Sequence, residues 1–508
     1  MCVLLHATVV SVSSAATQPV VTDAILAGYT RLYAGDPDAA YRHFESLRGR
    51  ETRHLPAWFG LLFALEARLA AEETLQPTFE ALIDPFIAHA TERLARSAAD
   101  DEALFYLAQA YLLRSTYRLE NDKGVWGAAR DAARAKGYID DYIKRRPEHG
   151  DAYFVLGLYN YYVDIAPSFI KVLRVLLFLP SGSRAEGLKQ LERTARSGSL
   201  FAPLAESALA DIDGSPEGRL AEAVPMAERI VQRYPGNADM RLTLAQMYTH
   251  PSVEAYDRAA QQYSAVIDAA TTGSPRHLAE RYRGILGLSS LRRNQWRLDE
   301  AVALLTPVID QQIGQPAWVL PSFLLRRGNY RMLLNDAHAI DDARRVQGDA
   351  TMSTFRKPAA QLIAAITSRR ASNEGTIYAA LVPGNRLVIE RRWDDARAVY
   401  DKVAASAPGD LQVRYRLAYL DFARGNYDAA ATALQPLTTA PRAPGWLKAA
   451  SLLTLAWTHD IAGRRGEALT LYKRIVENHE NEAAAGSAQL GLLAPYRGPA
   501  VRNGRQPG

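Results

Sequence analysis

Small and large apolar residues recur along this chain at a spacing that predicts paired α-helices. An alanine is followed four residues later by a large apolar residue, which places both side chains on one face of a helix. From Ala396 this pair recurs after 34 residues and again after a further 38. The pairs are Ala40 with Phe44, Ala259 with Tyr263, Ala301 with Leu305, Ala396 with Tyr400, Ala430 with Leu434, and Ala468 with Tyr472. A period near 34 residues built from two helices predicts a solenoid of stacked helix pairs.

Prolines recur where helices are expected to end. Pro147, Pro235 and Pro408 stand in the segments RRPEHGDAY, RYPGNADMR and SAPGDLQVR, each between two apolar-periodic stretches. Proline stops a helix, and the Asp or Asn that follows can accept hydrogen bonds from the first N–H groups of the next one. Alanine, leucine and arginine dominate, and long alternating runs of β-branched residues are scarce. The chain is therefore predicted to be all-α.

With these features the chain resembles the tetratricopeptide repeat family. The family pattern has a Leu-Gly pair in helix A, an alanine and an aromatic residue in helix B, and a closing proline. Leu156-Gly157 and Leu417-Ala418 occupy the helix A position here, and the resemblance extends over most of residues 20–494. It implies an α-α superhelix of roughly ten to twelve helix pairs, with a concave groove for a protein segment. Such a fold does not by itself name a partner.

One stretch in the middle of the chain interrupts the period. Residues 351–384 contain Lys357-Pro358 and Pro383-Gly384, and they separate the flanking repeats by more than one regular unit. This predicts an extra helix and an irregular junction. The expected divisions are an N-terminal superhelix over residues 19–350, the junction over 351–384, C-terminal repeats over 385–494 and a flexible tail over 495–508.

A second interruption is an apolar helix predicted over residues 168–179. These twelve residues include Lys171 and Arg174, and they are too few for a membrane span, which needs about 20 apolar residues. We interpret the segment as an inserted helix that is buried on most sides; the alternative is a helix on a membrane surface with both cations at the headgroups. The surrounding residues 124–210 resemble bacterial tetratricopeptide proteins of unassigned role. They are more distantly similar to the eukaryotic tetratricopeptide repeat protein thirty-nine and the Iml-type group.

The amino terminus resembles the end of a secretory signal. An apolar stretch from Cys2 to Val12 is followed by Ser14-Ala15-Ala16, a small-x-small cleavage pattern, although a basic region before it is missing. This predicts a truncated signal peptide over residues 1–18 and a location in the periplasm or cell envelope, with the cytoplasm as the alternative. Cys2 is the single cysteine, which excludes an internal disulfide and a cysteine-based zinc site.

Charge and motifs argue against nucleic acid and against catalysis. The formal net charge is +5, but 51 arginines and nine lysines are spread along the chain without a basic block. The phosphate-loop, dinucleotide, zinc-protease and serine-hydrolase motifs are all absent, and no two histidines lie within four residues of each other. Acidic pairs such as Asp341-Asp342 are interpreted as helix starts, where the helix dipole favours negative charge. We therefore predict no enzyme, no cofactor and no metal.

The predicted function is a scaffold that binds a partner segment in the groove. Helical register, with Gly157 at the helix A glycine position, places several aromatic residues where members of this family line the groove. Aromatic side chains offer large contact areas at low entropic cost. Alternatives are an envelope assembly factor that contacts the membrane surface through residues 168–179, and an enzyme with an unrecognised pocket. The candidate partner-binding residues are Phe154, Tyr161, Tyr162, Arg326, Asn329, Tyr415, Tyr419, Phe422 and Trp457.

Overall fold

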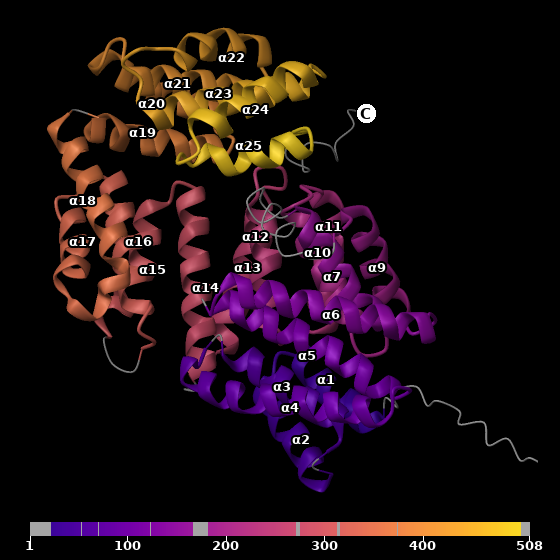
Figure 1. Ribbon diagram of the computed structural model, residues 1–508. Coiled ribbons are helices and arrows are strands. Elements are labelled where there is room, and N and C mark those ends of the chain that lie inside the picture. Colours follow the sequence, from indigo (N-terminus) through magenta and orange to yellow (C-terminus); the bar gives the residue numbers. More distant parts are fainter. Residues whose placement is uncertain are drawn as a thin grey trace, which may run out of the picture. The chain divides into compact units, whose positions relative to one another are not determined.

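The computed structural model (Figure 1) consists of helices and their connections. It describes residues 22–51, 53–69, 71–121, 123–165, 181–270, 275–311, 315–372 and 374–498. These residues form 24 α-helices and three 3-10 helices, and no strand occurs among them. The predicted all-α class is therefore confirmed. The apolar helix predicted over 168–179 and the signal segment over 1–18 lie outside the described residues.

The chain divides into two compact units, with the boundary between Leu209 and Ala210. The sequence predicts a division at 351–384 instead, which falls inside the second unit. The first unit contains α1 (Asp23–Tyr33), α2 (Pro37–Arg50), α3 (Leu55–Leu69), η1 (Glu73–Leu75), α4 (Gln76–Arg96), α5 (Asp101–Glu120), α6 (Val125–Arg145), α7 (Ala152–Ile165), α9 (Arg184–Ser197) and the first part of α10 (Ala202–Gly214).

The second unit begins within α10 and continues to the end of the described chain. Its further α-helices are α11 (Leu220–Arg233), α12 (Ala238–Thr249), α13 (Tyr256–Ala269), α14 (Pro275–Asn294), α15 (Leu298–Asp310), α16 (Val319–Leu333), α17 (Ala339–Gly348), α18 (Arg356–Ala371), α19 (Glu374–Ile389), α20 (Trp393–Ser406), α21 (Leu411–Arg424), α22 (Tyr427–Leu434), α23 (Gly445–Ile461), α24 (Arg465–Asn478) and α25 (Ala484–Leu493). Its 3-10 helices are η2 (Ala350–Phe355) and η3 (Gln435–Thr438).

The first helices of successive pairs form a row in the second unit. The contacts run from α12 to α14, from α14 to α16, from α16 to α19, from α19 to α21 and from α21 to α23. Since α16 contacts α19 directly, α18 lies outside the row and packs on α16 and α17. This is the extra helix that the irregular spacing predicts. Pro383 and Gly384, which the sequence places in the junction, lie inside α19.

The alanine and the large apolar residue of each predicted pair are buried. In all six pairs the alanine is 0% exposed and the larger residue at most 3% exposed. Glycines on neighbouring helices make room for the larger side chains: a Cβ atom on Gly384 would lie 2.4 Å from the Tyr400 ring, and one on Gly491 would lie 2.5 Å from the Tyr472 ring. The pattern therefore marks helix contact surfaces, as predicted.

Helices end before Pro147, Pro235 and Pro408, as expected. Two of the polar residues that follow these prolines cap the next helix. Asn237 caps α12 by accepting from the Met240 N–H at 3.1 Å. Asp410 caps α21 by accepting from the Gln412 N–H at 2.8 Å. Asp151, after Pro147, is used differently. It is fully buried and accepts the N–H groups of Ser199, Leu200 and Phe201 at 2.8 to 3.1 Å.

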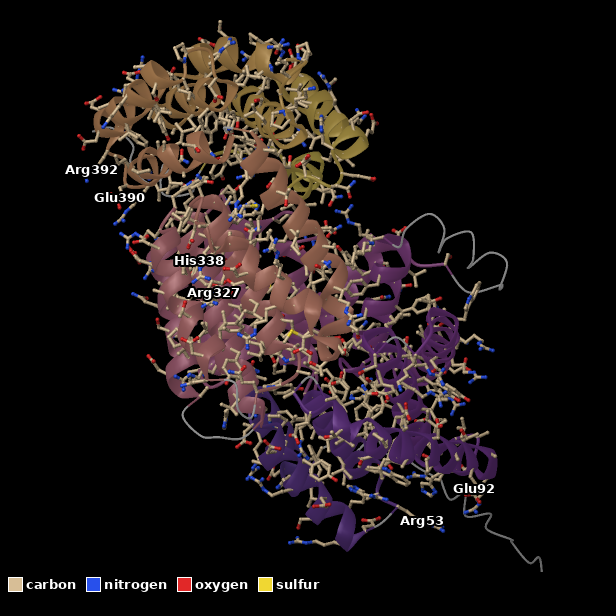
Figure 2. All side chains as sticks on the ribbon, turned by 90° about the vertical axis from the view of Figure 1, so that its left-hand side faces the viewer. Arg53, Glu92, Arg327, His338, Glu390 and Arg392 are labelled. Atoms are coloured by element: carbon tan, nitrogen blue, oxygen red, sulfur yellow. The ribbon has the colours of Figure 1, made fainter. Side chains whose placement is uncertain are left out.

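A buried ion pair joins α16 and α17. Its cation, Arg327, is labelled in Figure 2. Arg327 donates to the two carboxylate oxygens of Asp342 at 2.9 and 2.7 Å, and both residues are buried. Arg331 adds a third donor to the same carboxylate at 3.2 Å. Because Asp342 lies in the first turn of α17, it also faces the favourable end of the helix dipole.

Seven of the turns between helices share one backbone feature. A residue with left-handed φ stands two positions before the second helix begins, and it is often glycine because glycine lacks the Cβ atom that strains this conformation. The residues at this position are Gly35, Gly218, Glu254, Trp296, Arg391, Gly425 and Gly463.

We expect Gly425→Ala to lower the free energy of unfolding of the second unit by about 1 kcal/mol. Gly425 has a φ of +92°, and an added Cβ would meet no atom within 4 Å, so the backbone alone would cause the loss. The matched control is Gly466→Ala inside α24, which also has open space and should be neutral or stabilising by up to about 1 kcal/mol. Urea unfolding followed by tryptophan fluorescence measures both. Equal effects of the two substitutions would contradict the backbone explanation.

Candidate functional site

Aromatic residues and one arginine form a continuous series across the second unit, which we call the aromatic ladder. The members come from the first helices α19, α21 and α23, from the turn before α15 and, in the case of Tyr496, from the residues after α25. Successive ring centroids lie 4.6 to 6.1 Å apart, and the Arg416 guanidinium lies 4.7 Å from the Trp296 ring and 5.2 Å from the Tyr415 ring. In order, the ladder contains Trp446, Tyr378, Trp296, Arg416, Tyr415, Tyr419, Phe422, Trp457 and Tyr496.

The helical register of α21 explains the centre of the ladder. Tyr415, Tyr419 and Phe422 follow at spacings of four and three residues, so their side chains lie on one face of the helix. Tyr415 and Phe422 are buried, and Tyr419 is half-buried. Burial, followed by the charge of Glu254, raises the pKa of Tyr419 well above its ordinary value. This face of α21 thus lies close to the turn between α12 and α13.

One end of the ladder lies at the last described residues of the chain. The Tyr496 ring stacks on Trp457 with centroids 4.6 Å apart and an interplanar angle of 21°. The Tyr496 N–H donates to Asp460 Oδ2 at 2.8 Å. Asp460 is itself buried, and it accepts from Arg465 at 3.0 Å and from the Tyr472 hydroxyl at 2.8 Å. A carboxylate held in this way has a defined orientation toward the Tyr496 backbone.

A small cavity of about 40 Å³ adjoins this end of the ladder, between Trp457, Tyr496 and His250. His250 Nδ1 accepts from the Ser252 N–H at 3.1 Å. The proton of the neutral ring is therefore on Nε2, which is buried without a hydrogen-bond partner. Burial lowers the pKa of His250 to about 4, so this histidine is neutral at physiological pH.

The other end of the ladder lies beside an open groove of about 630 Å³. Trp446 Nε1 donates to Glu374 Oε1 at 3.1 Å, and Glu374 lines the groove together with Ile377, Gln412 and Leu447. Gln412 Nε2 donates to the Glu374 carbonyl at 3.3 Å, whereas its Oε1 atom is buried without a hydrogen-bond partner. This end of the ladder therefore joins apolar surface to hydrogen-bond acceptors.

Comparisons with known proteins match two parts of the second unit to one family. Models described as "Tetratricopeptide repeat" match residues 217–275 and 387–449. These two parts of the chain are therefore tetratricopeptide repeats. Similar solved structures include the crystal structure of the P58(IPK) TPR domain, which is 13% identical, with 75% of this chain and 96% of that chain covered. The TM-score is 0.19, too low to define a shared arrangement. No curated protein matches the sequence, and the narrower resemblance of residues 124–210 stays a prediction.

The predicted binding residues fall in both units of the chain. Tyr415, Tyr419, Phe422 and Trp457 lie together in the aromatic ladder. Arg326 is exposed on α16 and donates to Ser290 Oγ at 2.6 Å. Asn329 is half-buried on the same helix. Their roles in partner binding stay predictions.

The three candidates on α7 belong to the first unit. Phe154 is buried, and its ring centroid lies 5.4 Å from that of Phe201. Tyr161 is fully buried beside Gly187, where an added Cβ would lie 2.6 Å from the Tyr161 nitrogen. Tyr162 is 49% exposed. Two of these three side chains thus pack between helices in this structure.

Several ladder residues are not among the sequence-based candidates. Trp296 occupies the left-handed turn position that Gly425 and Gly463 hold in later repeats, so an alignment of the turns could have marked it. Arg416 follows a candidate tyrosine directly. Tyr496 falls in the predicted flexible tail, yet it is buried. Nothing in the repeat pattern indicates the contact of this tyrosine with Trp457.

The described residues contain little that suggests other chemistry. Among them, no group of three or more His, Cys, Asp or Glu side chains could hold a metal ion. No helix in the same part of the chain is both long enough and apolar enough to cross a membrane. The features of the site are thus apolar contact surface, a cation and oriented hydrogen-bond acceptors.

Proposed function

We propose that this protein is a non-catalytic scaffold that binds a segment of a partner protein along the aromatic ladder. The observation that carries the proposal is the continuity of the ladder across the first helices of consecutive repeats. Tetratricopeptide repeats support protein binding in general, and stacked repeats provide extended surfaces for this purpose.

The composition of the ladder suits a protein interface. Tyrosine, tryptophan and arginine are the residues most enriched at the energetic centres of interfaces. Trp296, Trp446, Tyr419 and Trp457 are half-buried, so each retains surface that a partner could cover. The series alternates apolar faces with polar edges, which favours a segment with apolar anchors and main-chain or acidic groups between them.

Arg416 is the ladder residue that can bind a negatively charged or carbonyl oxygen of a partner. Its guanidinium lies between the Trp296 and Tyr415 rings, 4.7 and 5.2 Å from their centroids. Cation–π contacts hold the side chain in place but leave its N–H donors able to bind a carboxylate or a carbonyl. We infer that an acidic or main-chain oxygen of the partner segment binds there.

We expect Arg416→Glu to reduce partner recovery at least tenfold, the equivalent of about 1.4 kcal/mol or more at an interface centre. The measurement is affinity capture from the native host followed by quantitative mass spectrometry. The matched control is Arg414→Glu, an exposed position on the same helix that points roughly to the opposite side. Equal recovery of every captured protein with wild type, Arg416→Glu and Arg414→Glu would overturn the proposal.

A further inference from the structure

The segment that follows α25 leaves its helix for a reason visible in the sequence. Proline restricts the residue before it to extended conformations, and Ala494, which precedes Pro495, has φ −139° and ψ 145°. The helix therefore ends at Leu493, and the chain continues as an extended segment through Pro495 and Tyr496 to Gly498. Residues 494–498 form no helix, and we call them the terminal segment.

The terminal segment lies on the aromatic ladder in the manner of a bound peptide. Tyr496 is 8% exposed, although both of its neighbours in sequence, Pro495 and Arg497, are exposed. Its ring stacks on Trp457, and the Phe422 ring centroid lies 6.4 Å away. Only one residue of the segment thus inserts its side chain between helix-borne rings.

The backbone of the terminal segment donates a hydrogen bond to Asp460, a carboxylate that other residues already orient. Asp460 Oδ2 accepts the Tyr496 N–H, and Arg465 orients that carboxylate while donating to the Gly491 carbonyl at 2.6 Å. Phe422, Trp457 and Asp460 together form what we call the terminal slot. The slot contacts an aromatic ring and a main-chain N–H, and both features are available in any segment with an aromatic residue in extended conformation.

We propose that the terminal slot is a docking site for an extended partner segment in which an aromatic residue follows proline, and that the terminal segment of this chain occupies it until such a partner displaces it. This inference rests on the proposed function, because the slot is the last part of the aromatic ladder. It specifies which class of partner segment binds the terminal slot. It also means that the terminal segment of this chain competes with the partner for that slot.

Tethering decides how strong this competition is. A segment joined to its site by a short connection has an effective concentration on the order of millimolar. A free peptide that binds the empty slot with a dissociation constant of roughly 100 μM would then appear at least about tenfold weaker in the intact chain. Release of the terminal segment should increase apparent affinity by the same factor.

The test uses full-length chains and a fluorescein-labelled peptide with the sequence of residues 493–503, LAPYRGPAVRN. Fluorescence anisotropy measures its binding to wild type, to Tyr496→Ala and to Pro495→Gly. The Tyr496→Ala chain lacks its own anchor and should bind the peptide at least tenfold more tightly than wild type. Pro495→Gly keeps every slot residue and removes only the restriction on Ala494, so it should lie between the two. If Tyr496→Ala fails to fold, the comparison of Pro495→Gly with wild type still tests the inference.

Two controls define what would overturn the inference. The peptide with alanine in place of its tyrosine should not bind, and Trp457→Ala introduced together with Tyr496→Ala should abolish binding of the original peptide. The inference is refuted if the peptide binds all full-length chains equally or binds none of them. It is also refuted if the alanine peptide binds as well as the original peptide. If the peptide fails while Arg416→Glu still loses its partner, only this inference is wrong. If the peptide binds while Arg416→Glu changes nothing, the proposed function fails and the slot stands.

Discussion

Replacement of Asp342 by alanine is expected to lower the free energy of unfolding of the second unit by about 3 to 5 kcal/mol. The substitution leaves the guanidinium of Arg327 buried between α16 and α17 without the carboxylate that it contacts at 2.7 and 2.9 Å. A buried unpaired charge costs more than the lost pair itself contributes. Urea unfolding followed by tryptophan fluorescence suits the test, because five of the seven tryptophans lie in the second unit.

Two further variants separate the buried charge from the lost contact. The double substitution Arg327→Met with Asp342→Leu removes both charges and should recover much of the stability, since apolar residues of similar volume can replace a buried ion pair. Asp401→Ala breaks a pair with Arg397 in which both side chains are 53% exposed, and it should cost about 0.5 kcal/mol or less. A loss below about 1 kcal/mol for Asp342→Ala would contradict the explanation.

The sequence predicts Asp342 as a helix start, but it does not predict Arg327 as its partner. Helix starts follow from local patterns, and the same is true of the alanine pairs and the closing prolines, which predict helix pairs and their contact faces. The ion pair instead depends on how α16 and α17 cross, which residue spacing alone does not determine. The extra helix α18 could be predicted from the excess spacing, whereas its place outside the row of first helices could not.

The candidate site shows the same limit. Tyr415, Tyr419 and Phe422 share a face of α21 because of helical periodicity, so the sequence brings them together correctly. Trp296 and Tyr496 join them only because distant parts of the second unit meet at the ladder. Tyr496 lies in a short segment with two glycines and two prolines nearby, and such a composition predicts a flexible tail. Its ring contact with Trp457 is a property of the folded unit.

In the first unit we expect Asp151→Ala to be as destabilising as the change at Asp342, by about 3 to 5 kcal/mol. Asp151 is the only acceptor found for the Ser199 and Leu200 N–H groups among the described residues, and it also accepts from Phe201. These bonds hold the turn between α9 and α10. Hydrogen exchange measured by mass spectrometry resolves the two units, and it should show lost protection in residues 184–209 but not in 374–498.

The stabilisation that Asp151 provides is expected to depend on pH and to be lost in acid. Burial raises the pKa of Asp151, but hydrogen bonds from His149 and from the N–H groups of residues 199–201 more than offset it, so the folded pKa lies below its ordinary value of 3.8. A lowered folded pKa means that the stabilisation is present above about pH 4 and is lost as the pH falls through the folded value.

Asp151→Asn should be intermediate in stability and should remove this acid dependence from the first unit. The matched control is Asp141→Ala, an exposed partner of Lys144, which should retain the wild-type dependence. An Asp151→Asn chain that loses protection below pH 4 as steeply as wild type would place the acid-sensitive group elsewhere.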